Sequence, residues 1–181
     1  MASRKGIERM SQSEVLLTAA RFRVERLRAP LPGGRWFDRE VVRHPGAVVI
    51  LPLLDDGRVV LLRNYRPTVE RELIELPAGT CEPGEGLIET ARRELAEETG
   101  YHAEQLDPLM AFYPSPGILD ERMHVFVARK LTPGPQRLDS GEQLQPFVAD
   151  WDQIAALLRE KRIEDAKTLA VLLYWRFVEN G

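Results

Sequence analysis

The sequence predicts an α/β fold, because segments with strand character and segments with helical periodicity both occur along its 181 residues. Three observations carry this prediction. Residues 47–54 form an apolar run rich in β-branched side chains, as in a buried strand. Residues 87–99 have helical spacing and stop at Gly100, and two amphipathic segments follow near the C-terminus.

The N-terminal segment is expected to be a separate run of strands. Residues 1–12 are polar and predicted to be loose, whereas apolar residues partly alternate over 14–28 and again over 35–42. A proline- and glycine-rich turn lies between these two stretches. We therefore assign residues 1–42 to an N-terminal extension and residues 43–181 to the main domain.

The main domain is expected to start with the 47–54 strand. Asp55, Asp56 and Gly57 then predict a hairpin turn, after which residues 59–63 return as the partner strand. Residues 73–76 lead into a glycine-bearing loop at 79–86. The remaining predictions are strands near 109–113 and 123–128 and helices over 150–161 and 165–178.

Composition excludes several functional classes. The net charge is −3 and no strong basic run occurs, which argues against nucleic acid as the main partner. Cys81 is the only cysteine, so no intrachain disulfide can form and a reducing cytoplasm is the expected location. The N-terminus has no apolar signal-type region and the chain no long apolar span, so we expect neither secretion nor a membrane partner.

One spaced pattern, G-x5-E-x7-R-E-L-x-E-E-x-G-Y, runs from Gly79 to Tyr101. Its chance frequency is on the order of one in a hundred million per start site, so coincidence is a poor explanation. Glu94, Glu97 and Glu98 stand at i, i+3 and i+4 and therefore share one helical face. Clustered carboxylates behind a glycine-bearing loop suit Mg²⁺, which prefers a few carboxylates plus phosphate oxygens.

The same periodicity predicts which residues occupy the other sides of this helix. We expect Arg92 and Arg93 to lie on a different side from the three glutamates, so that a divalent ion supplies the missing counter-charge. The apolar stripe predicted to pack on a sheet consists of Leu87, Ile88, Ala91 and Leu95.

This stretch resembles the signature motif of the Nudix hydrolases, and every defining position is filled. The resemblance implies an α/β/α sandwich with a mixed β-sheet, here preceded by an N-terminal β-strand segment. It also implies cleavage of a nucleoside diphosphate linked to another group, with Mg²⁺ or Mn²⁺ as cofactor. Arg93 is implied to hold the loop carboxylate Glu85. The implied metal ligands are the backbone carbonyl of Ala78 and the carboxylates of Glu94 and Glu98, assisted by Glu97.

The flanking residues resemble the ADP-ribose pyrophosphatase subgroup. The resemblance rests on residues 39–46, on 63–67, on the stretch before Gly79, and on Ser115, Pro116 and Gly117 downstream. It implies a nucleoside diphosphate sugar as substrate and a homodimer in which the N-terminal strands pack across the partner. The implied substrate contacts are Arg39, Arg66, Glu82, Ser115, Pro116 and Gly117. Each has a plainer alternative, a surface ion pair, a solvated loop acid or an ordinary turn.

The general base is left open between two residues. The subgroup resemblance points to Glu142, in the loop before the last strand, and Glu97 of the helix is the alternative. The resulting hypothesis is hydrolysis of ADP-ribose to AMP and ribose 5-phosphate, with Glu97, Glu98, Glu142 and Arg93 as catalytic residues. GDP-mannose is the alternative substrate, and a non-catalytic nucleotide-sugar sensor is the alternative from outside the enzyme class.

Overall fold

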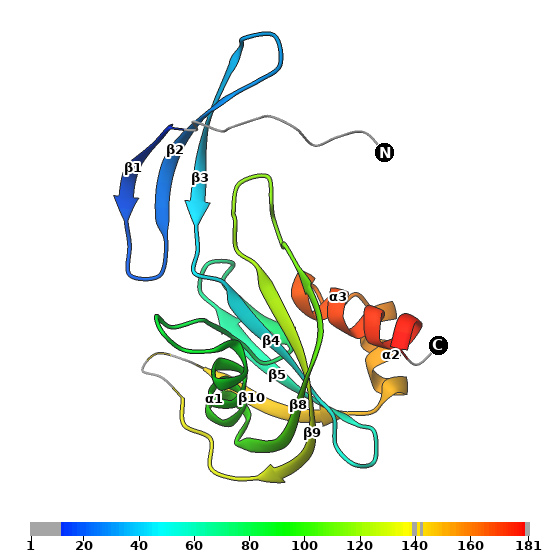
Figure 1. Cartoon of the computed structure of the whole chain (residues 1–181). Coiled ribbons are helices and arrows are strands. Elements are labelled where there is room, and N and C mark those ends of the chain that lie inside the picture. Colours follow the sequence, from blue (N-terminus) through cyan, green and yellow to red (C-terminus); the bar gives the residue numbers. More distant parts are fainter. Residues whose placement is uncertain (1–11, 139–140, 142, 180–181) are drawn as a thin grey trace, which may run out of the picture.

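The computed structural model describes residues 12–138, 141 and 143–179. The main domain has two sheets that lie between α1 on one side and α2 and α3 on the other (Figure 1). The four-stranded sheet, in the order β7-β4-β9-β8, comprises β4 (Ala47–Pro52), β7 (Ala78–Thr80), β8 (Tyr101–Phe112) and β9 (Met123–Pro133). The three-stranded sheet, in the order β10-β5-β6, comprises β5 (Val59–Arg66), β6 (Arg71–Glu75) and β10 (Leu144–Ala149). The helices are α1 (Leu87–Thr99), α2 (Trp151–Arg159), α3 (Ala166–Tyr174) and the π-helical turn η1 (Trp175–Glu179).

Strand β4 organises the layers because all six of its residues are buried. Successive side chains of a strand point to opposite faces. Val48 and Ile50 therefore join the apolar cluster beneath α1, while Val49 and Leu51 join the cluster covered by α2 and α3. Parallel pairing of β4 with β9 and antiparallel pairing with β7 make the sheet mixed. The predicted α/β/α sandwich is confirmed.

The predicted hairpin at residues 55–57 is only partly correct. The turn forms, with the Gly57 amide donating to the Leu54 carbonyl at 2.8 Å. Beyond one bridge between Leu53 and Val59, however, β4 and β5 belong to different sheets. A turn signal fixes where the chain reverses, but a strand buried on both faces can take its partners from anywhere in the fold.

Helix α1 also corrects part of the predicted apolar stripe. Ala91 and Leu95 are fully buried against the sheet, whereas Leu87 and Ile88 are 36% and 42% exposed. Thr90 is buried in their place, at the start of the helix. The predicted stop is confirmed, because Gly100 adopts a left-handed φ of 73° and its amide donates to the Ala96 carbonyl. A side chain there would also collide with the Gly134 carbonyl.

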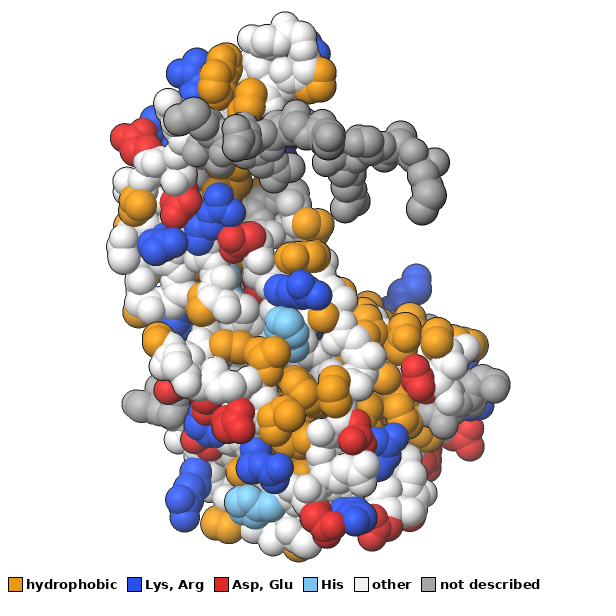
Figure 2. All heavy atoms as spheres, viewed as in Figure 1, with side chains coloured by type: hydrophobic (Ala, Val, Ile, Leu, Met, Phe, Trp, Pro, Cys, Tyr) orange, Lys and Arg blue, Asp and Glu red, His pale blue; other side chains and the backbone are white. Residues whose placement is uncertain are grey.

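The N-terminal strands form a sheet of their own. β1 (Gln12–Thr18), β2 (Arg23–Pro30) and β3 (Trp36–Arg43) are antiparallel and project away from the main domain (Figure 1). Backbone hydrogen bonds between Val42 and the 118–120 segment attach the end of β3 to the main domain. Figure 2 shows side chains of both charges on this sheet, with hydrophobic ones among them. Nearly all of the stretch predicted to be loose, residues 1–11, lies outside the described residues.

Candidate active site

The fold gathers distant segments around one cavity of about 850 Å³. Helix α1 contributes Arg93, Glu94 and Glu98, and the segment after β6 contributes Ala78 and the loop that follows it. Arg66 enters from the end of β5, and the start of α3 closes the opposite side. Of the predicted site residues, the structure brings together Ala78, Arg93, Glu94, Glu98, Arg66 and Glu82.

Arg93 is the centre of the carboxylate cluster, which corrects the prediction that it lies away from the glutamates. Its Nη1 donates to Glu94 at 2.9 Å and to Glu97 at 3.0 Å. Its Nε and Nη2 hold Glu85 at 3.1 and 3.0 Å, as the family resemblance implied. Helical spacing itself allows this contact, because Arg93 and Glu97 stand at i and i+4 and are therefore neighbours on the surface of α1. Arg92, in contrast, does turn away and donates to the Ala103 carbonyl.

These contacts alter the titration of the cluster. Hydrogen bonds from Arg93, and then from Thr90, hold the pKa of the Glu85 carboxyl below its ordinary value against the opposing effect of burial. The Arg93 guanidinium has its pKa raised, chiefly by its hydrogen bonds to Glu85 and by the charge of Glu94. Both groups therefore remain charged over the whole physiological range.

Glu98 and Gly79 define how α1 sits against the loop. The Glu98 carboxylate is nearly buried and accepts a 2.9 Å hydrogen bond from the backbone amide of Ala78. The carboxylate of Glu94 lies so close to Gly79 that any Cβ at that position would overlap it. A side chain at position 79 would force the Glu94 carboxylate to move, so glycine at the start of the motif preserves the position of this candidate metal ligand.

The donor set suits a hard divalent cation. Glu94 and Glu98 line the same cavity as Ala78, and all three offer oxygen donors, the type that Mg²⁺ prefers. Across the described residues, no group of three or more His, Cys, Asp or Glu side chains is already arranged as a metal cage. In the structure the Nη1 of Arg93 contacts both Glu94 and Glu97, at 2.9 and 3.0 Å.

The remaining predicted substrate contacts lie beside the cavity. Arg39 on β3 donates to the Gly117 carbonyl at 2.9 Å, which joins two predicted residues to each other. Ser115 accepts from the amides of Ile118 and Leu119, so the 115–117 stretch forms a tight turn. Neither Arg39 nor this turn is part of the cavity wall, which includes Pro114 before the turn and Glu121 after it.

The structure describes one of the two candidate bases, Glu97, but not the other, Glu142. Glu97 is bound to Arg93 and is not part of the cavity wall. Glu142 lies outside the described residues, although its sequence neighbours Gly141 and Gln143 both line the cavity. Gln136 donates from its side chain to the Glu98 carbonyl at 2.6 Å and so fixes the start of this loop to the end of α1.

The sequence did not predict four charged residues of the cavity wall, namely Arg21, Glu121, Asp165 and Lys167. It also did not predict a role for Glu75, which contacts Lys167 from behind the wall. Glu75 belongs to the stretch before Gly79 that carried the subgroup resemblance, so a signal for it existed. For Asp165 and Lys167 we find none, because a helix about 70 residues beyond α1 reaches the site only through tertiary packing.

Cys81 lines the cavity but is not a nucleophile candidate. Burial, together with the negative charge of Glu85, raises the pKa of its thiol. A protonated thiol is a poor nucleophile, so the residue keeps the spacer role predicted from the sequence.

Comparison with known proteins identifies the family. The model of the NUDIX domain matches residues 42–172. The chain is 39% identical over 151 residues to "ADP-ribose pyrophosphatase" of Bacillus subtilis (strain 168), covering 82% of each chain. It is equally similar, with the same coverage, to "Methanol dehydrogenase activator" of Bacillus methanolicus. A crystal structure of "ADP compounds hydrolase" superposes with a TM-score of 0.81 at 26% identity, over 96% of this chain and 95% of that one. The chain therefore belongs to the NUDIX domain family, and residues of its motif form part of the wall of the candidate site.

Proposed function

We propose that this enzyme hydrolyses the diphosphate of ADP-ribose to AMP and ribose 5-phosphate. One observation carries the proposal: a single cavity of about 850 Å³ combines Glu94 and Glu98 of α1 with the guanidinium of Arg66. Acidic side chains for a divalent ion and an arginine for phosphate oxygens are the combination that a diphosphate requires. Similarity to an ADP-ribose pyrophosphatase over most of both chains supports the choice of substrate.

The proposed cofactor is Mg²⁺, with Mn²⁺ as the alternative. Glu94, Glu98 and the Ala78 carbonyl would hold it, with Glu97 assisting. When bound, the ion supplies a Lewis acid that neutralises charge on the phosphate oxygens. Arg93 would then keep Glu85 through Nε and Nη2, while Nη1 gives up its carboxylate partners.

The chain's own residues would perform the remaining steps. Arg66 binds non-bridging phosphate oxygens and orients the diphosphate in the cavity. A water molecule attacks one phosphorus, its proton passes to Glu142 or Glu97, and the bridging P–O bond breaks to release the two monophosphates. Gly141 and Gln143, the sequence neighbours of Glu142, line the cavity, whereas Glu97 does not, and this supports Glu142 as the base.

The substrate is tested by supplying Mg²⁺ with ADP-ribose or with GDP-mannose to the purified enzyme. We expect kcat/KM for ADP-ribose to exceed that for GDP-mannose by at least about tenfold, which is about 1.4 kcal/mol of discrimination. The comparison substrate is chosen because the chain is also 30% identical, over 156 residues, to "GDP-mannose pyrophosphatase" of Escherichia coli. Preference for GDP-mannose would overturn the substrate but retain the chemistry. Tight binding without turnover of either would favour the sensor alternative.

The N-terminal extension, residues 1–42, is proposed to form a homodimer interface beside the domain of residues 43–181, in a cytoplasmic enzyme. Strand β1 is an edge strand whose seven residues are all exposed. Val15 and Leu17 are 54% and 53% exposed, and exposed apolar edge strands tend to pair with another chain. The hydrogen bond from Arg39 to Gly117 connects this sheet to the turn that is predicted to contact substrate.

Among the described residues, no helix combines the length and apolar character that a bilayer span needs.

Light scattering on the eluting peak of a sizing column tests the dimer. We expect a mass about twice 20.6 kDa at micromolar concentration. Charges on β1, as in Val15→Glu combined with Leu17→Glu, should give the monomer mass, because edge carboxylates oppose strand pairing. A matched control, Glu14→Gln, should remain dimeric. A monomeric wild type would contradict the interface.

A further inference from the structure

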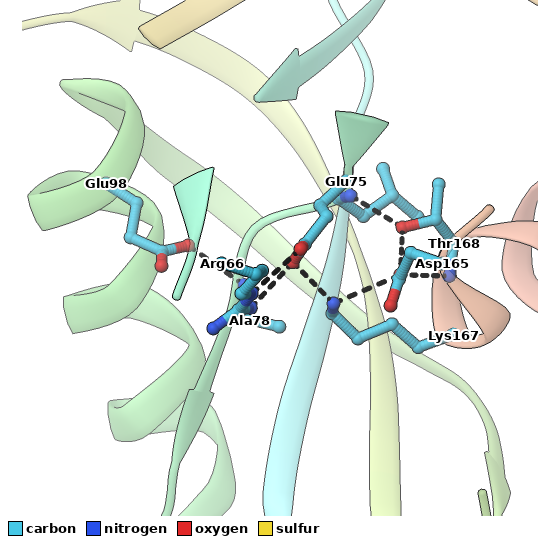
Figure 3. Close-up of polar contacts among 8 residues, drawn as sticks. Arg66, Glu75, Ala78, Glu98, Asp165, Lys167 and Thr168 are labelled. Carbon is cyan, nitrogen blue, oxygen red and sulfur yellow. Dashed lines mark hydrogen bonds and ion pairs between the residues drawn. The ribbon is translucent and has the colours of Figure 1, made fainter. Parts of the chain in front are cut away.

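Arg66 is held by a buried network of charges that extends from the cavity to α3 (Figure 3). Its Nε and Nη2 donate to the two carboxylate oxygens of Glu75 at 2.8 and 2.6 Å. The ammonium of Lys167 approaches one of those oxygens at 2.6 Å and Asp165 at 3.0 Å. The side chains of Glu75 and Lys167 are only 2% and 8% exposed. Two cations thus face two carboxylates, and the charges of these four side chains balance around the buried Glu75 and Lys167.

The beginning of α3 fixes the far end of this network. Asp165 caps the helix and accepts from both the amide and the hydroxyl of Thr168, at 2.9 and 2.6 Å. The same hydroxyl oxygen accepts a 2.8 Å hydrogen bond from the Leu76 amide, next to Glu75 in the chain. Lys167 therefore has a defined position relative to Glu75, because strand and helix are joined on both sides of it.

The orientation of Arg66 matters because only one edge of its guanidinium is occupied. Among the described residues, hydrogen bonds to Glu75 use Nε and Nη2, and Nη1 has no partner. The Arg66 side chain is 42% exposed although the carboxylate behind it is buried. In Figure 3, Arg66 is drawn between Glu75 on one side and Glu98 of α1 on the other. The free edge is therefore available to phosphate oxygens in the cavity.

We propose that Lys167 is a positioning residue, which acts through Glu75 to hold Arg66 toward the diphosphate. The inference rests on the proposed function, since it names the device that orients the phosphate-binding arginine. Arg66 must serve two anions at once when the substrate arrives, the buried Glu75 and the diphosphate. Lys167 supplies Glu75 with a second countercharge, so that the guanidinium is not drawn back into the protein.

A direct contact between Lys167 and substrate fits the geometry less well. Its ammonium lies between two carboxylates at 2.6 and 3.0 Å, and would have to leave both of them to reach a phosphate. A purely structural role is the other alternative. An experiment can distinguish these two alternatives from a positioning role. Only in a positioning role does the loss of affinity on replacing Lys167 depend on the presence of Arg66.

The test is a double-mutant cycle on the full chain with Lys167→Met and Arg66→Met. Dissociation constants for ADP-ribose are measured by calorimetry without a divalent ion, and KM and kcat with Mg²⁺. We expect Lys167→Met to raise both Kd and KM by about tenfold with little change in kcat, and to have no further effect once Arg66 is replaced. Lys167→Arg, which keeps the charge, should restore most of the affinity. If Lys167→Met does not fold, Lys167→Gln takes its place in the cycle.

Each outcome has a defined meaning. An equal loss of affinity with and without Arg66 would overturn the inference, whether Lys167 binds substrate itself or only maintains the fold. So would a Lys167→Met enzyme with unchanged KM and Kd. These results require a wild type that binds and hydrolyses ADP-ribose. A wild type that does neither refutes the proposed function instead.

Discussion

Replacing Glu98 by glutamine is expected to lower kcat by about a thousandfold or more while the protein stays folded. Glu98 is nearly buried, lines the cavity and accepts a hydrogen bond from the Ala78 amide. A glutamine side chain has the same size, and its amide oxygen can keep that hydrogen bond. The substitution therefore removes the negative charge for a cation without removing the contact between helix and loop. Steady-state hydrolysis of ADP-ribose with saturating Mg²⁺ measures the loss.

The matched control is Glu89→Gln on the same helix. Glu89 is exposed in the first turn of α1 and is not part of the cavity wall, so its replacement should leave kcat within about twofold of wild type. Thermal unfolding of both variants should resemble that of the wild type. Near-normal turnover by the Glu98→Gln enzyme would show that the assignment of the metal ligands is wrong.

The second large effect is expected on stability, from Glu75→Gln. This buried carboxylate is the partner of Arg66 and Lys167, and its loss leaves the two cations with Asp165 as the one remaining carboxylate of the network. Removing one partner of a buried ion pair typically costs about 3–5 kcal/mol. Chemical denaturation at pH 7 should show a loss of that size in the free energy of unfolding. The control Glu72→Gln, on the same strand but with 54% of its side chain exposed, should change it by less than about 1 kcal/mol.

Because of Glu75, we expect the folding stability of the wild-type protein to decrease in acid. Burial alone would raise the pKa of Glu75, but the hydrogen bond from Arg66 and the charge of Lys167 lower it from 4.5 to about 2. A folded-state pKa below the unfolded value means that the stabilisation is complete above the unfolded pKa and disappears as pH falls from 4.5 toward 2. A shift of this size corresponds to about 3 kcal/mol. The stability difference between wild type and Glu75→Gln should therefore shrink over that interval, and a constant difference would contradict the assignment.

Much of the architecture and half of the site could be predicted from the chain. Local rules located α1 and its stop at Gly100, because helical spacing and a left-handed glycine are properties of neighbouring residues. The same rules placed Glu94 and Glu98 on one face and pointed to a divalent ion. The contact between Arg93 and Glu85 came from the family resemblance, and the structure contains it.

Two predictions from the sequence were wrong, one about the pairing of distant strands and one about the side of α1 on which Arg93 lies. The turn at Gly57 was predicted correctly, but β5 pairs with β6 and β10 rather than with β4. The pairing of a strand buried on both faces depends on the packing of the whole core, which local sequence does not contain. The prediction that Arg93 lies away from the glutamates is wrong because Glu97 stands four residues after it, and the structure joins the two in an i, i+4 ion pair.

Local sequence was enough to predict the divalent-ion chemistry, because the carboxylates that suit such an ion stand within about 20 residues of continuous chain. Tertiary structure alone decided how that chemistry is supported. Arg66, Glu75 and Lys167 are separated by up to about 100 residues, yet together with Asp165 they form one charge-balanced network. Their meeting depends on how α3 packs beside β6, and no local spacing rule contains that information.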